Sequence, residues 1–224
     1  MNKKSLIIAL TALITPALFA LCYFVLFPDP PLARVFYFAS RAVFILLPVL
    51  WTMYAEKKRF PRPRPKGDGI RMGIVSGTII GITAIILYAN VFTSLPVENV
   101  QNRAVKLGFA GNLFFLFAVF LIIMNSSLEE YYWRWFGFSK LKEVFPTWPS
   151  ILLSGVGFAL HHVIILVVFF GWGPGLFFGF FVGVGGSIWC WFYDRYDSIW
   201  PSWISHAIVD AALMFIGYDM LFCR

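Results

Sequence analysis

The chain alternates between long apolar runs and short polar or proline-rich segments. A helix that crosses a bilayer needs about 20 apolar residues, and on that rule the pattern predicts about seven spans. They are expected over residues 5–27, 34–54, 70–95, 107–133, 149–170, 175–193 and 199–221. We therefore predict an all-α, polytopic integral membrane protein that forms one transmembrane domain over residues 1–224.

Two of the expected spans carry a small residue at every fourth position. This spacing places the small residues on one face of a helix, where a neighbouring helix can approach closely. The first series is Gly69, Gly73, Gly77 and Gly81, and the second is Gly175, Gly179, Gly183 and Ser187. We expect two close-packing seams, and the two spans share no further similarity that would indicate an internal duplication.

Composition agrees with a membrane location and indicates an orientation. Hydrophobic residues make up 60% of the chain and charged residues 13%, with a mean hydropathy of +0.78. The formal net charge is +7, and basic residues gather in a loop between Glu56 and Arg71. Basic loops remain on the cytoplasmic side of a membrane, and Lys3 and Lys4 agree with that placement. We predict a cytoplasmic N-terminus and membrane lipid as the surroundings, and we exclude nucleic acid as a partner.

Several features are expected near the membrane surfaces. Arg41, in the outer half of the second span, is expected to extend its guanidinium toward the headgroups. Residues 96–106 are expected to form an outer loop. The aromatic residues within 131–135 fit an interfacial belt, and residues 137–145 fit a short amphipathic helix along the inner surface.

Three late spans place ionisable side chains inside apolar segments. A charged group at bilayer depth is costly, so it indicates function by default. Histidine and carboxylate are also the side chains suited to proton transfer near neutral pH. These residues are Glu129, Glu130, His161, His162, His206 and Asp210. We predict a polar site among the last four helices.

The adjacent glutamates differ in their expected partners. Glu130 and Arg134 are four residues apart and can pair along a helix. Glu129 points about 100° away from Glu130, and no basic residue follows it at helical spacing. The spacing predicts one structural carboxylate and one that is free for chemistry.

Three short motifs in this part of the chain resemble those of a known family. Residues 129–134 fit EExxxR, residues 158–162 fit FxxxH and residues 206–210 fit HxxxN/D. In this order on late membrane helices they resemble the CAAX protease and bacteriocin-processing family (CPBP, also called Abi) of intramembrane proteases. The resemblance covers residues 126–210, inside a core expected over residues 107–221.

The resemblance implies a glutamate-dependent endopeptidase. By it, Glu129 acts as the general base on a water molecule, with help from His162. His206 and Asp210 stabilise the oxyanion of the tetrahedral intermediate. Structural support for this machinery comes from Glu130, Arg134 and Phe158.

The last motif position leaves two alternatives open. An ionised aspartate accepts hydrogen bonds but cannot donate them, so Asp210 would have to be protonated, orient His206 or bind a metal. Two histidines and a carboxylate with an open fourth position form a catalytic zinc pattern. Zinc could therefore be held by Glu129, His162 and His206. His161 fits no motif position and is expected to pack or to support the site from behind.

Helix geometry sets a condition on this site. Glu129 and His206 are expected in the inner half of the membrane, whereas His162 lies roughly 20 Å along its span at the usual helical rise. That helix must protrude, tilt or bend for the three side chains to meet. Gly155 and Gly157 offer a place for a bend.

Two other functions use the same residues. The chain could be a non-catalytic membrane scaffold or bacteriocin-immunity protein, or a proton-coupled transporter with the ionisable groups as a relay. A transporter would need broken helices and a solute path, which the steady spans do not indicate. For the endopeptidase, the substrate is expected to be a membrane-associated peptide or protein in a bacterial cytoplasmic membrane, with the site facing the cytoplasm. The oligomeric state does not follow from the sequence.

Overall fold

The computed structural model describes residues 3–57, 67–92, 95, 97–108 and 111–224. In these residues the chain is helical apart from short turns and connections, and it contains no strand. Seven helices are long and apolar enough to cross a membrane: Lys3–Leu26, Pro31–Ala55, Gly67–Asn90, Leu113–Lys142, Thr147–Phe170, Trp172–Tyr196 and Trp200–Phe222. The protein is therefore an all-α, polytopic integral membrane protein, as predicted. Most of the basic loop, residues 58–66, lies outside the described residues.

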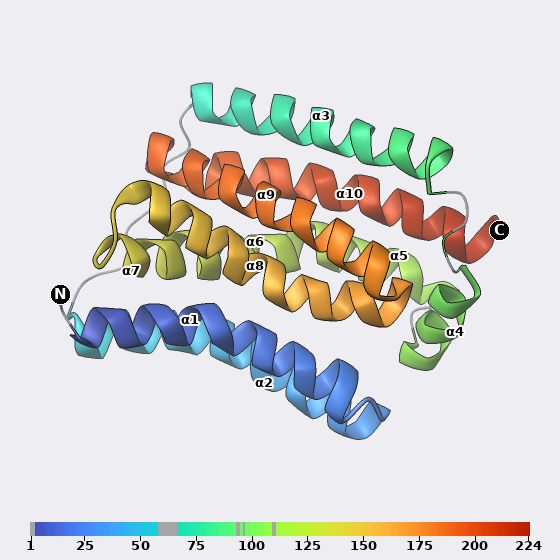
Figure 1. Ribbon diagram of the computed structural model, residues 1–224, viewed down its shortest axis with the longest axis horizontal. Helices are drawn as coiled ribbons and strands as arrows, with labels where there is room; N and C mark the ends of the chain where they lie inside the picture. The colour runs from blue at the N-terminus through green and yellow to red at the C-terminus, as the bar shows by residue number, and fades with distance from the viewer. Residues whose placement is uncertain (1–2, 58–66, 93–94, 96, 109–110) are drawn as a thin grey trace.

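The helices form a bundle of roughly parallel and antiparallel rods (Figure 1). Their bounds are α1 (Lys3–Leu21), α2 (Pro30–Leu50), α3 (Gly67–Asn90), α4 (Val97–Leu107), α5 (Leu113–Val119), α6 (Ser126–Glu130), α7 (Ser139–Lys142), α8 (Thr147–Phe170), α9 (Trp172–Tyr196) and α10 (Trp200–Phe222). In Figure 1, α3 and α10 lie on one side, α8 and α6 in the middle, and α1 and α2 on the other side. The two termini lie at opposite ends, as an odd number of crossings requires.

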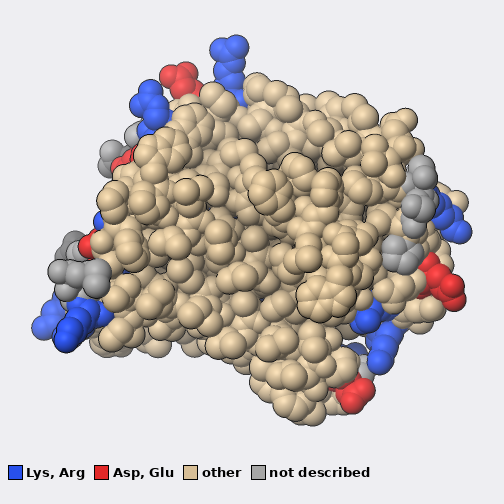
Figure 2. Space-filling model, viewed as in Figure 1, with Lys and Arg blue, Asp and Glu red and all other residues tan. Residues whose placement is uncertain are grey.

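Charged side chains are concentrated at the ends of the bundle. Figure 2 shows Lys, Arg, Asp and Glu toward both ends of the viewed face, with a broad band between them that carries none. Large apolar side chains on several helices remain exposed, for example Ile79, Leu116 and Phe180. Such a band is expected of a surface in contact with acyl chains.

Helix boundaries follow from local sequence. Proline at the first helical positions begins both α2 and α10, because proline is pre-organised for a helix start and has no N–H to leave unsatisfied. Only Gly171 separates α8 from α9, with φ of +83°, a conformation that glycine adopts without steric cost. A single residue therefore connects the fifth and sixth spans.

Both glycine seams are confirmed. A Cβ atom added at Gly73 would lie 2.5 Å from the carbonyl oxygen of Pro201, and one at Gly77 would lie 2.8 Å from that of Ser205. These contacts fix α3 directly on the backbone of α10. In the second seam, an added Cβ at Gly179 would lie 2.2 Å from a methyl of Val163. The seams therefore set the positions of α8 and α10, the two helices that carry the histidines.

The fourth span differs from its prediction. It begins at Leu113 and runs to Lys142 as one helix of 30 residues, with π-helical segments over Phe120–Asn125 and Tyr131–Phe138 on either side of α6. Part of the expected outer loop instead forms α4, an amphipathic helix.

Two surface predictions in this span are wrong. Tyr132 and Trp133, expected in an interfacial belt, are fully buried, because the helix continues past them instead of ending at the membrane surface. Lys140, expected on a surface helix, is also buried, and its amine contacts the carboxylates of Glu56 and Glu143. The ion pair with Glu56 fastens α7 to the end of the second span.

Candidate active site

The site lies at the middle of the fourth span, where α6 carries both glutamates. α6 is a single α-helical stretch between the two π-helical segments. π-Helical turns often mark functional sites because they change which residues face a neighbouring helix. α8 and α10 bring the histidines to this point, as the motif order predicted.

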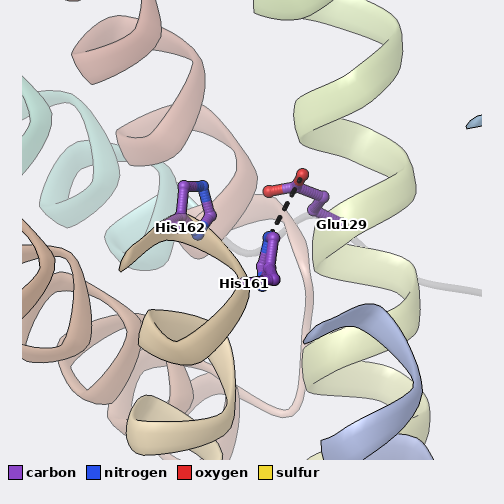
Figure 3. Close-up of side chains that lie close together, drawn as sticks. All are labelled: Glu129, His161 and His162. Carbon is purple, nitrogen blue, oxygen red and sulfur yellow. Dashed lines mark ion pairs between the residues drawn. The ribbon is translucent and has the colours of Figure 1, made fainter. Parts of the chain in front are cut away.

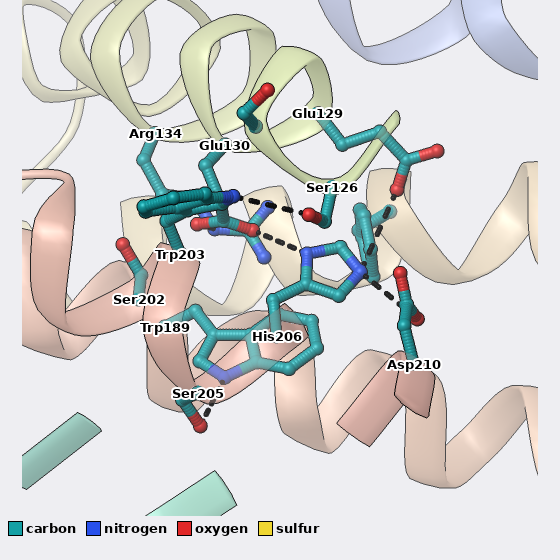
Figure 4. Close-up of polar contacts among 12 residues, drawn as sticks. Ser126, Glu129, Glu130, Arg134, Trp189, Ser202, Trp203, Ser205, His206 and Asp210 are labelled. Carbon is teal, nitrogen blue, oxygen red and sulfur yellow. Dashed lines mark hydrogen bonds and ion pairs between the residues drawn. The ribbon is translucent and has the colours of Figure 1, made fainter. Parts of the chain in front are cut away.

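Glu129 is buried, with only 4% of its surface exposed, and lies among imidazoles. Its Oε1 is 4.0 Å from His161 Nε2, and its Oε2 is 3.9 Å from His206 Nε2 (Figures 3 and 4). One hydrogen bond reaches the carboxylate, from Asn125 Nδ2 at 3.0 Å. Among the described residues, no lysine or arginine forms an ion pair with Glu129. This carboxylate is the one that the spacing predicted to be free for chemistry.

Glu130 has strong partners on both oxygens. Its Oε2 lies 3.0 Å from Arg134 Nε in an ionic contact that is poorly aligned as a hydrogen bond. Its Oε1 accepts a hydrogen bond of 2.9 Å from His206 Nδ1 (Figure 4). Both Glu130 and Arg134 are fully buried. The predicted structural pairing is present, and Glu130 also orients a histidine, which the spacing did not show.

His206 is fixed from three directions. Trp189 stacks on its ring at a centroid distance of 4.2 Å, and Trp189 is in turn held by a hydrogen bond to Ser205 Oγ. Because Nδ1 is engaged by Glu130, only Nε2 faces the centre of the site. Asp210 Oδ1 lies 3.6 Å from that nitrogen.

His162 presents one nitrogen to the site. Its Nδ1 lies 2.9 Å from the carbonyl oxygen of Phe158, and since a carbonyl can only accept, Nδ1 carries the proton in that contact. The neutral ring then has a lone pair on Nε2. Phe158 is buried beneath Arg134, whose guanidinium carbon is 4.6 Å from the ring centroid. The FxxxH motif therefore supplies both the packing residue and the acceptor for the histidine.

His161, which was expected to pack or to support the site from behind, lies directly beside Glu129. One ligand atom each from Glu129, His161 and His162 come within 4.8 Å of one another, and Figure 3 shows the three side chains together. His161 stacks on Trp133, and neither ring nitrogen has a hydrogen-bond partner among the described residues. His206, which the predicted zinc set contained, is not part of this close group.

The three helices meet although no break interrupts α8. α8 is continuous, and its two glycines serve packing: Gly155 lies against α9 and Gly157 against Leu13 and Trp133. Since the fourth span continues to Lys142, Glu129 lies about 20 Å from that end. This depth is close to the predicted depth of His162. The expected difference in depth between Glu129 and His162 arose because the fourth span was predicted to end at residue 133, nine residues before its observed end.

Three residues near the site were missed or misplaced. Asn125 precedes Glu129 by four residues, so helical spacing could have identified it. Arg41 was expected to reach the headgroups, but its Nη1 instead lies 2.6 Å from Asn125 Oδ1. Trp189 lies on the glycine-rich α9 and belongs to no motif, so nothing in its spacing indicated contact with His206.

Comparison with known proteins agrees with the motif order. Residues 111–212 match the family model described as Type II CAAX prenyl endopeptidase Rce1-like. This segment belongs to the Rce1-like family. The resemblance to CAAX proteases is thereby confirmed, and the Rce1-like segment contains every motif residue described above. No curated protein and no solved structure matches the chain.

Rce1-like membership supports an intramembrane endopeptidase whose substrate is a membrane-associated protein. The Rce1-like segment begins within the turn before the fourth span and ends inside α10. α1, α2 and α3 therefore lie outside it, although α2 contributes Arg41 to the surroundings of Glu129.

Proposed function

We propose that this protein is an endopeptidase that hydrolyses a peptide bond of a membrane-associated peptide or protein with water activated by Glu129. The observation that carries the proposal is the position of this buried carboxylate, within 4.0 Å of two imidazole nitrogens and close to a third histidine. His162 and Asp210 keep partial exposure, so a substrate can approach on their side.

Each residue of the site has a separate role in the proposed reaction. Glu129 takes a proton from water as the oxygen attacks the carbonyl carbon, with His162 Nε2 accepting a hydrogen bond from the same water. When protonated on Nε2, His206 donates to the developing oxyanion, and Asp210 orients that ring. The C–N bond then breaks, the leaving amine takes the proton from Glu129, and the carboxylate is regenerated.

A metal-dependent form of the reaction uses a different set of residues from the one predicted. Glu129, His161 and His162 offer three ligand atoms within 4.8 Å of one another, and the unpartnered buried nitrogens of His161 fit a ligand role. His206 fits less well because Glu130 and Asp210 occupy its two sides. Bound zinc would supply a Lewis acid and a water that ionises near neutral pH.

We place the site on the side of the membrane that the N-terminus occupies, and that side in the cytoplasm. Lys3, Lys4 and the basic loop support this orientation through the positive-inside rule. We also keep the proposal of a bacterial cytoplasmic membrane, which is motivated by the sequence Met-Asn-Lys-Lys at residues 1–4. We also retain the proposal of a single domain.

The proposal is tested with the purified full chain and a membrane-tethered reporter peptide. Glu129→Gln should lower turnover at least roughly 100-fold, because it removes the base but keeps the shape. Glu98→Gln is the matched control, since Glu98 is exposed on α4. Unchanged turnover in Glu129→Gln would remove this mechanism and favour a scaffold or immunity role.

Metal content is measured on the same samples. Elemental analysis that finds about one zinc per chain, together with turnover lost to chelator and restored by zinc, would support the metal-dependent form. In that case His161→Asn should lower the zinc content. Full turnover in metal-free protein would support the purely glutamate-dependent form.

A further inference from the structure

A half-buried arginine from outside the family segment is connected to the site. Arg41 lies near the middle of α2, and its Nη1 is 2.6 Å from Asn125 Oδ1. Asn125 Nδ2 in turn donates to Glu129 Oε1 at 3.0 Å. Two consecutive hydrogen bonds thus join a cation on α2 to the carboxylate that would activate water.

The direction of the Asn125 amide follows from this arrangement. Its oxygen can accept from a guanidinium, and its NH2 group can donate to a carboxylate. The flipped amide would place NH2 against the cation and oxygen against the anion, and both contacts would be repulsive. Arg41 therefore determines which end of the amide faces Glu129, and so which direction the Glu129 carboxylate takes.

Aromatic rings hold Arg41 in place. Its guanidinium carbon is 5.1 Å from the ring centroid of Tyr37 and 4.8 Å from that of Phe44. Phe44 is almost completely buried and stacks on Tyr132 at 4.2 Å. Cation–π contacts of this kind become stronger as the cation loses water. The cation is thus attached both to its own helix and, through Phe44 and Tyr132, to the helix that carries Glu129.

The cost of an arginine at this depth requires a compensating role. A cation inside the bilayer costs free energy unless it reaches the headgroups or a partner. Arg34, on the same helix, is exposed, whereas the Nε of Arg41 is buried and has no hydrogen-bond partner among the described residues. An apolar side chain would fill the same space without the free-energy cost of a charge inside the bilayer.

We infer that Arg41 is a positioning residue for peptide hydrolysis, acting through Asn125 to fix the carboxylate of Glu129. The inference rests on the proposed function and adds to it a contribution from α2. The catalytic arrangement would then require a helix that lies outside the matched segment.

The test is a double-mutant cycle on the full chain with the reporter peptide. Arg41→Met and Asn125→Ala should each lower kcat roughly tenfold or more while KM changes less than about twofold, because a misplaced base slows the chemical step. The double variant should be no slower than either single variant, since both break one connection. Arg41→Lys, which keeps a donor for Asn125, should recover part of the loss, and Arg34→Met should be neutral.

Several outcomes would overturn the inference. A raised KM with unchanged kcat in Arg41→Met would show that Arg41 contacts the substrate instead. Additive losses would show that Arg41 and Asn125 act independently, and equal losses in Arg41→Met and Arg41→Lys with a lowered Tm would indicate a packing role. If Glu129→Gln is inactive and Arg41→Met is fully active, only this inference fails. If Glu129→Gln is fully active, the proposed function fails with it.

Discussion

Glu129 and Glu130 are adjacent, chemically identical and both buried, yet their surroundings differ. Glu130 has an arginine on one oxygen and an imidazole N–H on the other. Glu129 has one amide donor, with imidazole nitrogens about 4 Å away. A turn of about 100° between successive residues separates the two environments.

The comparison shows how one helical turn can hold a structural and a reactive carboxylate together. A carboxylate whose oxygens are both engaged is held in place and has little capacity for a water molecule. A carboxylate with a single donor and nearby imidazoles can bind water or a metal and exchange protons. Glu130 remains part of the mechanism through the orientation of His206, so the two roles are coupled.

The largest expected effect comes from neutralising each glutamate in turn and measuring stability beside turnover. Glu130→Gln leaves Arg134 buried without its ionic partner, and breaking a buried pair in this way costs about 3–5 kcal/mol in soluble proteins. Its Tm should fall well below that of Glu129→Gln, because Glu129 has no arginine or lysine in an ion pair among the described residues. Thermal unfolding in detergent, followed by tryptophan fluorescence, measures the difference.

The control for this experiment removes both charges. Glu130→Gln combined with Arg134→Met should be more stable than Glu130→Gln alone, because no unpaired charge remains. If Glu129→Gln proves the less stable of the two single variants, the assignment of structural and reactive roles is reversed.

An intermediate effect is expected from a substitution that displaces α10 and, with it, His206. Gly77→Val adds a side chain where a Cβ would already lie 2.8 Å from the carbonyl oxygen of Ser205, next to His206. Overpacking costs about 1–3 kcal/mol, so Tm should fall by roughly 3–10 °C and turnover should fall with it. Thr78→Val, one position along on the exposed face of α3, should change neither. Equal behaviour of both variants would mean that the seam does not position α10.

The smallest effect is expected at the edge of the site. Asp210→Asn keeps an oxygen near His206 Nε2 and adds an amide donor that can face the oxyanion. Turnover should stay within about threefold of the parent chain, whereas Asp210→Leu should lose more. A loss in Asp210→Asn as large as that in Glu129→Gln would show that the negative charge itself is required.

Features that repeat along one helix were predictable from the sequence. The seven spans follow from length and apolarity, and both seams follow from a four-residue spacing that the observed contacts confirm. The motif order also predicted that Glu129, His162 and His206 come to one site.

Features that depend on a second helix were not predictable. His161 fits no motif position, yet it reaches the group around Glu129 together with His162. The direction of Arg41 depends on an asparagine 84 residues away. The aromatic residues at 131–135 would fit either an interfacial belt or a buried core. Only the length of the helix, which continues to Lys142, distinguishes these two environments.

The contact of α3 with α10 has one more consequence. Where two helices meet through side chains, rotamer changes can absorb small displacements, but glycine against a carbonyl leaves no such freedom. A displacement of α10 must therefore carry α3 with it as one body. We therefore expect an incoming peptide to be accommodated on the side of the site that faces away from this seam.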